Sequence, residues 1–223
     1  MHVNTDNYKA LRLELGEHVT LVAVSKTKPV EDILALYEAG HRDFGENYVQ
    51  ELLEKARQLP ADIRWHFIGH LQTNKVKLIL PLVQLIHGVD SLKLLKEISK
   101  EAGKAGRTVD CLLQVHIAQE ETKFGLDEPE LKELMDRAAA GEWKHVSIRG
   151  LMGMASFTED RVRVRSEFAQ LKKLFDRYRA SAPDPDVFDT LSMGMSSDFR
   201  IAIEEGSNMV RIGSLLFGER ARK

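Results

Sequence analysis

The sequence predicts an α/β protein in which eight strands alternate with helices. Three observations support this prediction. Short apolar runs rich in β-branched residues recur along the chain, and amphipathic stretches with a helical period separate them. Candidate strands follow one another at a mean spacing of about 28 residues, the size of one strand–helix unit. Strict alternation of this kind implies parallel strands joined by right-handed crossovers.

Each element has its own signal in the sequence. The apolar runs predict strands over residues 20–25, 43–46, 65–69, 84–87, 111–117, 147–152, 189–193 and 210–213. Helical periodicity predicts helices over residues 29–39, 49–58, 91–102, 129–139, 159–180 and 198–204, with an extra helix over 4–15 before the first strand. Pro29 suits a helix start, and Gly40 and Gly206 stand where helices often end in glycine.

Two architectures satisfy this order of elements: an open doubly wound sheet and a closed (β/α)8 barrel. Eight strands favour the barrel, which forms from about 200 residues upward. The open sheet lacks support, because G-x-G-x-x-G and P-loop motifs are both absent from the sequence. We therefore expect residues 1–223 to form a single TIM-type barrel domain with an extra N-terminal helix.

Composition narrows the possible functions. The 223 residues carry a net charge of −2, with 43% hydrophobic and 30% charged residues. A nucleic-acid or membrane-surface binder would show a basic excess, so neither partner is expected. The single cysteine, Cys111, lies in an apolar run and reads as a core residue. The polar N-terminus does not resemble a signal peptide, and we expect a cytoplasmic monomer or weak dimer.

Lys26 is the most informative residue, because it follows the apolar run Val22-Ala-Val-Ser25 at the end of the first strand. Burial disfavours the charged ammonium. The lysine can extend to the rim or pair with an acid. Alternatively, it can be a nucleophile that forms a Schiff base with a carbonyl compound.

Functional groups of such barrels project from the C-terminal ends of the strands. Those ends carry Lys26, Asn47, His70, Asp90, Lys123, Met154, Ser196 and Arg211. The last two strands lead into glycine- and serine-containing loops, where Gly194, Gly213, Ser196 and Ser197 could hold a phosphate. Turn glycines and a serine N-cap are the simpler explanation of either loop alone.

Arg211 alternates with Val210 and Ile212 on the eighth strand, so its side chain should point into the barrel mouth. Its acceptor is either a core carboxylate or a ligand. A Schiff-base lysine, a phosphate loop and an arginine for a ring nitrogen together make up the requirements of a pyridoxal phosphate (PLP) site. His66 and His70 share one face of a strand but have no third ligand, so we expect no metal.

The sequence resembles the small pyridoxal phosphate homeostasis proteins, whose fold is similar to the barrel domain of alanine racemase. Sequence segments that carry the resemblance span nearly the whole chain. They are Val22-Ala-Val-Ser-Lys-Thr-Lys-Pro29, Phe44-Gly-Glu-Asn-Tyr-Val-Gln-Glu51, Trp65-His-Phe-Ile-Gly-His-Leu-Gln-Thr-Asn-Lys75, Lys123-Phe-Gly125, Gly150-Leu-Met-Gly-Met154, Leu191-Ser-Met-Gly-Met-Ser-Ser-Asp198 and Val210-Arg-Ile-Gly-Ser214.

The resemblance implies roles for six residues. Lys26 would form the internal aldimine, Asn47 would lie near the cofactor, and Arg211 would face the pyridine nitrogen. Ser196, Gly213 and Ser214 would hold the phosphate. His116 departs from the family pattern, where asparagine is expected, and this puts contacts at the fifth strand end in doubt.

Three functions remain open from the sequence. The first is a carrier that buffers PLP without catalytic turnover and delivers it to apoenzymes. The second is a single-domain amino-acid racemase. Alanine racemase has a tyrosine base on a second domain, whereas Tyr8, Tyr37, Tyr48 and Tyr178 all fall in predicted helices here, and Lys123 or a histidine would have to substitute. The third is a cofactor-free Schiff-base aldolase acting on a phosphosugar.

Overall fold

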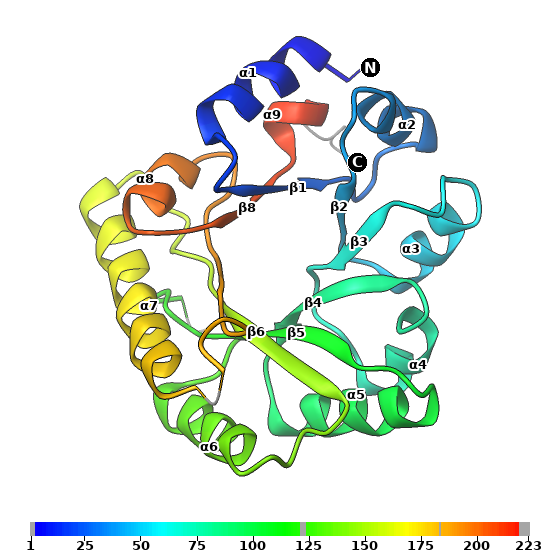
Figure 1. Ribbon diagram of the computed structural model, residues 1–223. Coiled ribbons are helices and arrows are strands. Elements are labelled where there is room, and N and C mark those ends of the chain that lie inside the picture. The colour runs from blue at the N-terminus through cyan, green and yellow to red at the C-terminus, as the bar shows by residue number, and fades with distance from the viewer. Residues whose placement is uncertain (1–2, 121–123, 183, 219–223) are drawn as a thin grey trace.

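Eight parallel strands close into a barrel that helices surround (Figure 1). The computed structural model describes residues 3–120, 124–182 and 184–218. Each strand pairs with the next along the chain, and β8 closes the barrel by pairing with β1, where Leu21 stands opposite Val210. The predicted (β/α)8 architecture is therefore confirmed.

The strands lie close to their predicted positions. They are β1 (Thr20–Val24), β2 (Asp43–Glu46), β3 (Arg64–Phe67), β4 (Val83–Val89), β5 (Val109–Gln114), β6 (Val146–Met152), β7 (Thr190–Ser192) and β8 (Met209–Ile212). The fifth strand begins and ends earlier than predicted. Val115 lies outside it and forms only an isolated bridge with Leu126.

The helices of the described residues include all those predicted. They are α1 (Thr5–Leu15), α2 (Val30–Glu38), α3 (Val49–Ala56), η1 (Thr73–Lys75), α4 (Val76–Ile79), α5 (Leu92–Lys104), α6 (Glu128–Ala139), α7 (Arg161–Ser181), α8 (Phe199–Glu204) and α9 (Ser214–Phe217). The extra helix α1 lies beside α9 in Figure 1 and buries Tyr8, Leu11 and Leu15.

Two helical segments were not predicted. Between β3 and β4, η1 and α4 bury Val76, Ile79 and Leu80, whose spacing places them on one face of a short helix. After β8, where only a tail was expected, α9 buries Leu216 and Phe217. Both helices are only four residues long, too short for helical periodicity to reveal them.

The inside of the barrel combines an apolar layer with buried polar groups. Val22, Leu85, Leu112, Met152 and Met209 form a hydrophobic cluster separate from the large core between strands and helices. Val210 and Ile212 belong to that large core, whereas Arg211 lies on the Met209 face of β8. The predicted inward direction of Arg211 is confirmed.

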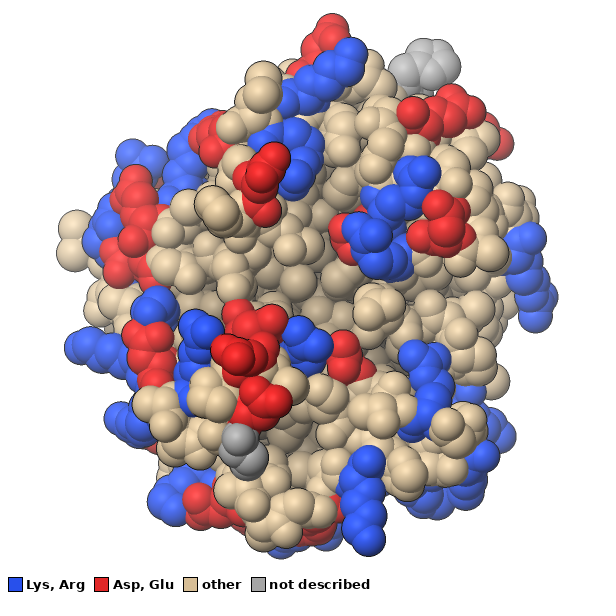
Figure 2. Space-filling view, viewed as in Figure 1, with Lys and Arg blue, Asp and Glu red and all other residues tan. Residues whose placement is uncertain are grey.

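Other sequence predictions can be placed on this fold. Cys111 is a free, fully buried cysteine in the large core. Among the described residues, no helix has the length and apolar character needed to cross a membrane. In the face shown in Figure 2, acidic and basic side chains stand next to one another in mixed groups, and neither sign dominates.

Candidate functional site

The six residues predicted to bind a cofactor all line one cleft of about 400 Å³ at the C-terminal ends of the strands. Its described lining comprises Val24, Lys26, Lys28, Asn47, Ile68, Met154, Phe157, Met195, Ser196, Ser197, Arg211, Gly213, Ser214 and Gly218. The volume is within the range of small-molecule sites. Lysine and arginine are the charged residues of this lining, and it includes no aspartate or glutamate. The cleft therefore suits an anionic ligand.

Lys26 lies two residues beyond the end of β1, in a turn with unusual backbone geometry. The next residue, Thr27, has φ = 62°, a left-handed conformation that is costly for a β-branched side chain. The Thr27 N–H donates to Glu51 Oε1 at 2.5 Å, which holds the turn in place. Lys26 itself is half-buried and faces the cleft.

A buried ion pair fixes the other side of this turn. Lys55 Nζ on α3 donates to Ser25 O (2.7 Å), Glu46 Oε1 (2.7 Å) and Glu51 Oε1 (2.6 Å), and Ser25 Oγ also donates to Glu46 Oε1 at 2.6 Å. Glu46 is fully buried, and burial raises its pKa even though Lys55 opposes that shift. This cluster, hereafter the Lys55 clamp, holds the residues on both sides of Lys26.

Arg211 has its guanidinium fixed by neutral oxygen atoms. Nη1 donates to Ser192 O (2.9 Å) and Ser192 Oγ (2.6 Å), and Nη2 donates to Gly153 O (3.0 Å). No hydrogen bond within the described residues uses its Nε–H. Burial lowers the pKa of Arg211 to about 10, so it remains a cation at neutral pH. The sequence left open a core carboxylate as the acceptor for Arg211, but among the described residues its guanidinium donates to no carboxylate.

Ser196, Gly213 and Ser214 come together although they follow two different strands. Ser196 Oγ accepts from the Gly213 N–H at 3.3 Å, which links the loop after β7 to the loop after β8. Gly194 makes the first loop possible, because its φ is +99° and an added Cβ would lie 2.6 Å from that of Ala202. Lys28 Nζ then donates to Phe217 O at 2.7 Å and anchors α9 beside the cleft.

Asn47 contributes a polar atom that the described residues leave unpaired. Its Oδ1 is buried and has no hydrogen-bond partner among the described residues. Buried polar atoms are normally satisfied, so an unpaired one in a cleft indicates a place for a ligand atom or water. An unpaired acceptor, an arginine with a spare donor and two serine loops make a site that fits a phosphorylated pyridine aldehyde such as PLP.

Some predicted strand-end groups lie away from this cleft. His70 Nδ1 is 2.9 Å from Asp90 Oδ2, and both line a separate cavity of about 340 Å³. His116 Nε2 lies 3.0 Å from Glu120 O, and His116 is outside the cleft lining. Lys123 lies outside the described residues. No group of three metal-ligating side chains occurs in the part of the chain that the structure describes.

The tyrosine positions need one correction. Tyr8, Tyr37 and Tyr178 lie in helices, but Tyr48 precedes α3 at its N-cap position and is 56% exposed. The prediction that it lies within a helix was wrong, because its extended backbone at ψ = 125° ends the turn after Asn47. None of the four tyrosines belongs to the described lining of the cleft.

Sequence reasoning missed several residues that shape the site. The Lys55 clamp depends on partners from β1, β2 and α3, and spacing in the sequence could not show that they meet. A buried acid in Phe44-Gly-Glu46 and a lysine on the apolar face of 49–58 were the available signals. Phe157 and Met195 line the cleft from loops whose conformation has no sequence signature.

Comparison with known proteins places the chain in a family. Residues 4–221 match the family model for the N-terminal domain of alanine racemase. A curated protein of Aquifex aeolicus (strain VF5), named pyridoxal phosphate homeostasis protein, is 44% identical over 205 residues, covering 90% of this chain and 86% of the relative. The Escherichia coli (strain K12) protein of that name is 38% identical over 208 residues, 92% of this chain and 87% of the relative. The chain belongs to the pyridoxal phosphate homeostasis protein family.

Solved structures agree with this assignment. PipY of Synechococcus elongatus PCC7942, solved with PLP bound, superposes with a TM-score of 0.87 at 35% identity and covers 96% of this chain and 99% of its own. Alanine racemase from Bartonella henselae has a TM-score of 0.74 at 19% identity, which covers 97% of this chain and 60% of the racemase. The second likeness shows the barrel fold alone.

Proposed function

We propose that this protein binds PLP in the cleft and acts in PLP homeostasis as a carrier, with residues 1–223 forming a single binding domain. The observation that supports this most strongly is the convergence of Lys26, Arg211 and the Ser196–Gly213 contact on one cleft without acidic lining. The family name of the curated relatives and the PLP in PipY point the same way. The buried, unpaired Cys111 suits the reducing cytoplasm in which we place this function.

Each cleft residue has a distinct part in the proposal. Lys26 would hold the cofactor by condensing its Nζ amine with the aldehyde, which releases water, and the Lys55 clamp would hold its turn in position. Ser196, Gly213 and Ser214 bind the phosphate, with Lys28 adding positive charge nearby. The Arg211 guanidinium would donate a hydrogen bond to the pyridine nitrogen, while Asn47 Oδ1 would accept one from the ligand or a bound water.

Arg211 is also the reason for proposing no catalytic turnover. A guanidinium that stays protonated donates to the ring nitrogen and leaves that nitrogen unprotonated, so the bound ring withdraws electrons poorly. The described lining also lacks a tyrosine or histidine that could serve as a second proton-transfer group. The cofactor supplies the aldehyde chemistry, and the protein stores it for PLP-dependent apoenzymes.

The test combines binding and turnover. Purified protein is titrated with PLP by absorbance and fluorescence, next to Lys26→Ala, and both are then incubated with L- and D-amino acids. The proposal expects binding that the variant loses and no sustained racemisation. Sustained turnover that depends on Lys26 would favour the racemase instead. A protein that binds phosphosugars but remains colourless with PLP would support the aldolase.

A further inference from the structure

A row of buried polar side chains crosses the inside of the barrel from the cofactor cleft to the opposite face. It starts at Arg211, whose Nη1 donates to Ser192 Oγ at 2.6 Å. Ser192 Oγ lies 3.3 Å from His87 Nδ1, and His87 Nε2 lies 2.9 Å from His66 Nδ1. His66 Nε2 lies 3.1 Å from Asp43 Oδ1. These residues come from five strands, β8, β7, β4, β3 and β2.

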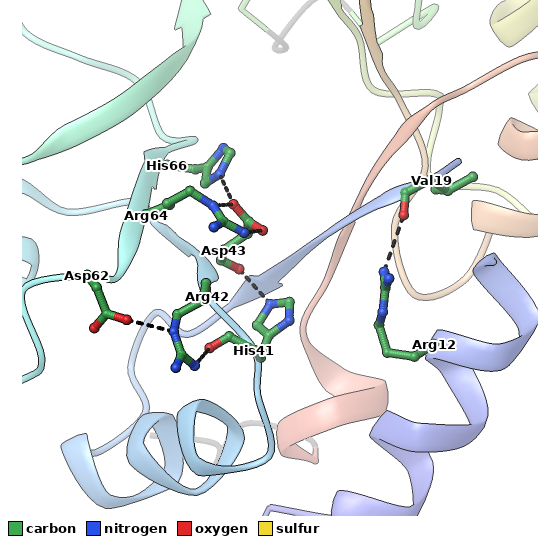
Figure 3. Close-up of polar contacts among 8 residues, drawn as sticks. All are labelled: Arg12, Val19, His41, Arg42, Asp43, Asp62, Arg64 and His66. Carbon is green, nitrogen blue, oxygen red and sulfur yellow. Dashed lines mark hydrogen bonds and ion pairs between the residues drawn. The ribbon is translucent and has the colours of Figure 1, made fainter. Parts of the chain in front are cut away.

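The row ends at the N-terminal ends of β2 and β3. Figure 3 shows Asp43 between His66 and Arg64, with the Arg42–Asp62 pair beside them. Arg64 binds Asp43 through two hydrogen bonds, Nε to Oδ1 at 2.7 Å and Nη2 to Oδ2 at 2.6 Å. The Arg64 side chain is 51% exposed, whereas His66, His87, Ser192 and Arg211 are all buried. The row therefore connects the cleft to a surface ion pair.

The hydrogen bonds of this row can all run in one direction, from Arg211 to Asp43. Arg211 can only donate, so Ser192 Oγ accepts from it, and the hydroxyl proton of Ser192 can be donated to His87 Nδ1. His87 then carries its proton on Nε2 and donates to His66 Nδ1, and His66 donates from Nε2 to the Asp43 carboxylate. In this direction His87 is a neutral ring that accepts at Nδ1 and donates from Nε2. Burial lowers the pKa of His87 well below its ordinary value, which agrees with a neutral ring.

The far end supplies a stable negative charge. Burial would raise the pKa of Asp43, but hydrogen bonds from Arg64 and His66 keep that pKa well below its ordinary value. Barrel interiors are normally filled by branched apolar side chains. A polar row of this length is costly unless every member is satisfied. It polarises Ser192 Oγ toward Arg211 and restricts the guanidinium to one orientation.

We infer that Ser192, His87, His66 and Asp43 are positioning residues for Arg211, which they hold with its Nε–H directed to the pyridine nitrogen of PLP. This inference rests on the proposed function, since it concerns the same site. It assigns a binding role to residues that lie below the cleft and do not touch the ligand. His66, His87 and Ser192 are absent from the described lining of the cleft.

The experiment compares four variants by PLP affinity, the position of the visible absorption band and the thermal midpoint of the apoprotein. His87→Leu breaks the row, and Ser192→Ala removes the link next to Arg211 with little change in volume. His87→Gln keeps an acceptor and a donor, as the ring nitrogens do. His41→Leu is the matched control. His41 is also a buried histidine, but its ring lies 2.8 Å from the backbone oxygen of Asp43 and bonds to no side chain of the row in the described residues.

We expect His87→Leu and Ser192→Ala to bind PLP about tenfold more weakly, the usual effect of losing one hydrogen bond to a charged group, and to shift the band. His87→Gln should restore most of both, and His41→Leu should lower only the thermal midpoint. Unchanged affinity and band in Ser192→Ala, or an equal shift in His41→Leu, would overturn the inference while leaving PLP binding intact. A wild-type protein that does not bind PLP would overturn the proposed function itself.

Discussion

The Lys55 clamp gives a prediction whose size follows from the burial of Glu46. In Lys55→Met, the apolar stem of the lysine is replaced by a side chain of similar length, and the ammonium disappears. Glu46 Oε1 keeps the hydrogen bond from Ser25 Oγ, but its carboxylate, which is 0% exposed, loses its counter-charge. Glu46 Oε2 already lacks a partner among the described residues.

In the variant, the Glu46 carboxyl either stays charged without a partner or takes up a proton. The less costly of the two sets the loss in the free energy of unfolding. An uncompensated buried charge costs about 3–5 kcal/mol. Taking up a proton instead costs about 3 kcal/mol at pH 7 for a group with an ordinary pKa of 4.5. We therefore expect the free energy of unfolding to fall by about 3 kcal/mol at pH 7. At pH 5.5 the proton costs only about 1 kcal/mol, so the loss should be smaller there.

Urea denaturation at the two pH values, followed by circular dichroism, measures this difference. Adding Glu46→Gln to Lys55→Met should recover most of the loss at pH 7, because no buried charge remains. Lys100→Met is the control, because Lys100 pairs with Glu97 at 3.0 Å on the surface and 57% of its side chain is exposed. This substitution should change the free energy of unfolding by less than about 0.5 kcal/mol. A loss below about 1 kcal/mol at pH 7, or one that does not depend on pH, would refute the reasoning.

Three further predictions follow from single residues. Burial lowers the pKa of His41 to about 4, so the unfolded chain takes up a proton that the folded protein resists, and stability falls as the pH drops from about 6.5 toward 4. Thermal melts should show about 2 kcal/mol of this loss by pH 5, and an equally steep loss in His41→Leu would contradict it. In Gly69→Ala, the new Cβ would lie 2.3 Å from Asn47 O and would displace Asn47. PLP binding, measured by titration, should then be at least about tenfold weaker. Unchanged affinity would show that the backbone adapts. Burial raises the pKa of Cys111, so a thiol reagent should label it only at urea concentrations that unfold the protein. Fast labelling of the native protein would contradict this and would place the thiol in a mobile region.

Much of the fold was predictable because local signals and the global architecture agree. β-Branched runs and helical periods each specify one element, and strict alternation then leaves few topologies. The short helices α4 and α9 were missed because four residues contain little more than one turn. Their buried side chains depend on neighbours from other elements, and no local pattern reports those contacts.

The site was predictable to the extent that strand ends converge at one rim of a barrel. That rule brings Lys26, Asn47 and Arg211 together, and the structure places them in one cleft. It does not show which side chains lie beneath them. His66 was considered for a metal from its spacing to His70, but it pairs with His87 on the adjacent strand β4, a contact that depends on strand register rather than sequence distance.

Trapping the covalent linkage tests the central claim most directly. Protein incubated with PLP is reduced with borohydride, digested and mapped by mass spectrometry, next to Lys26→Ala and Lys28→Ala. The account predicts a pyridoxyl group on the peptide containing Lys26, loss of the visible band on reduction, and no modification at this site in Lys26→Ala, with Lys28→Ala still modified. A pyridoxyl group on another lysine, or equal modification of Lys26→Ala, would contradict it.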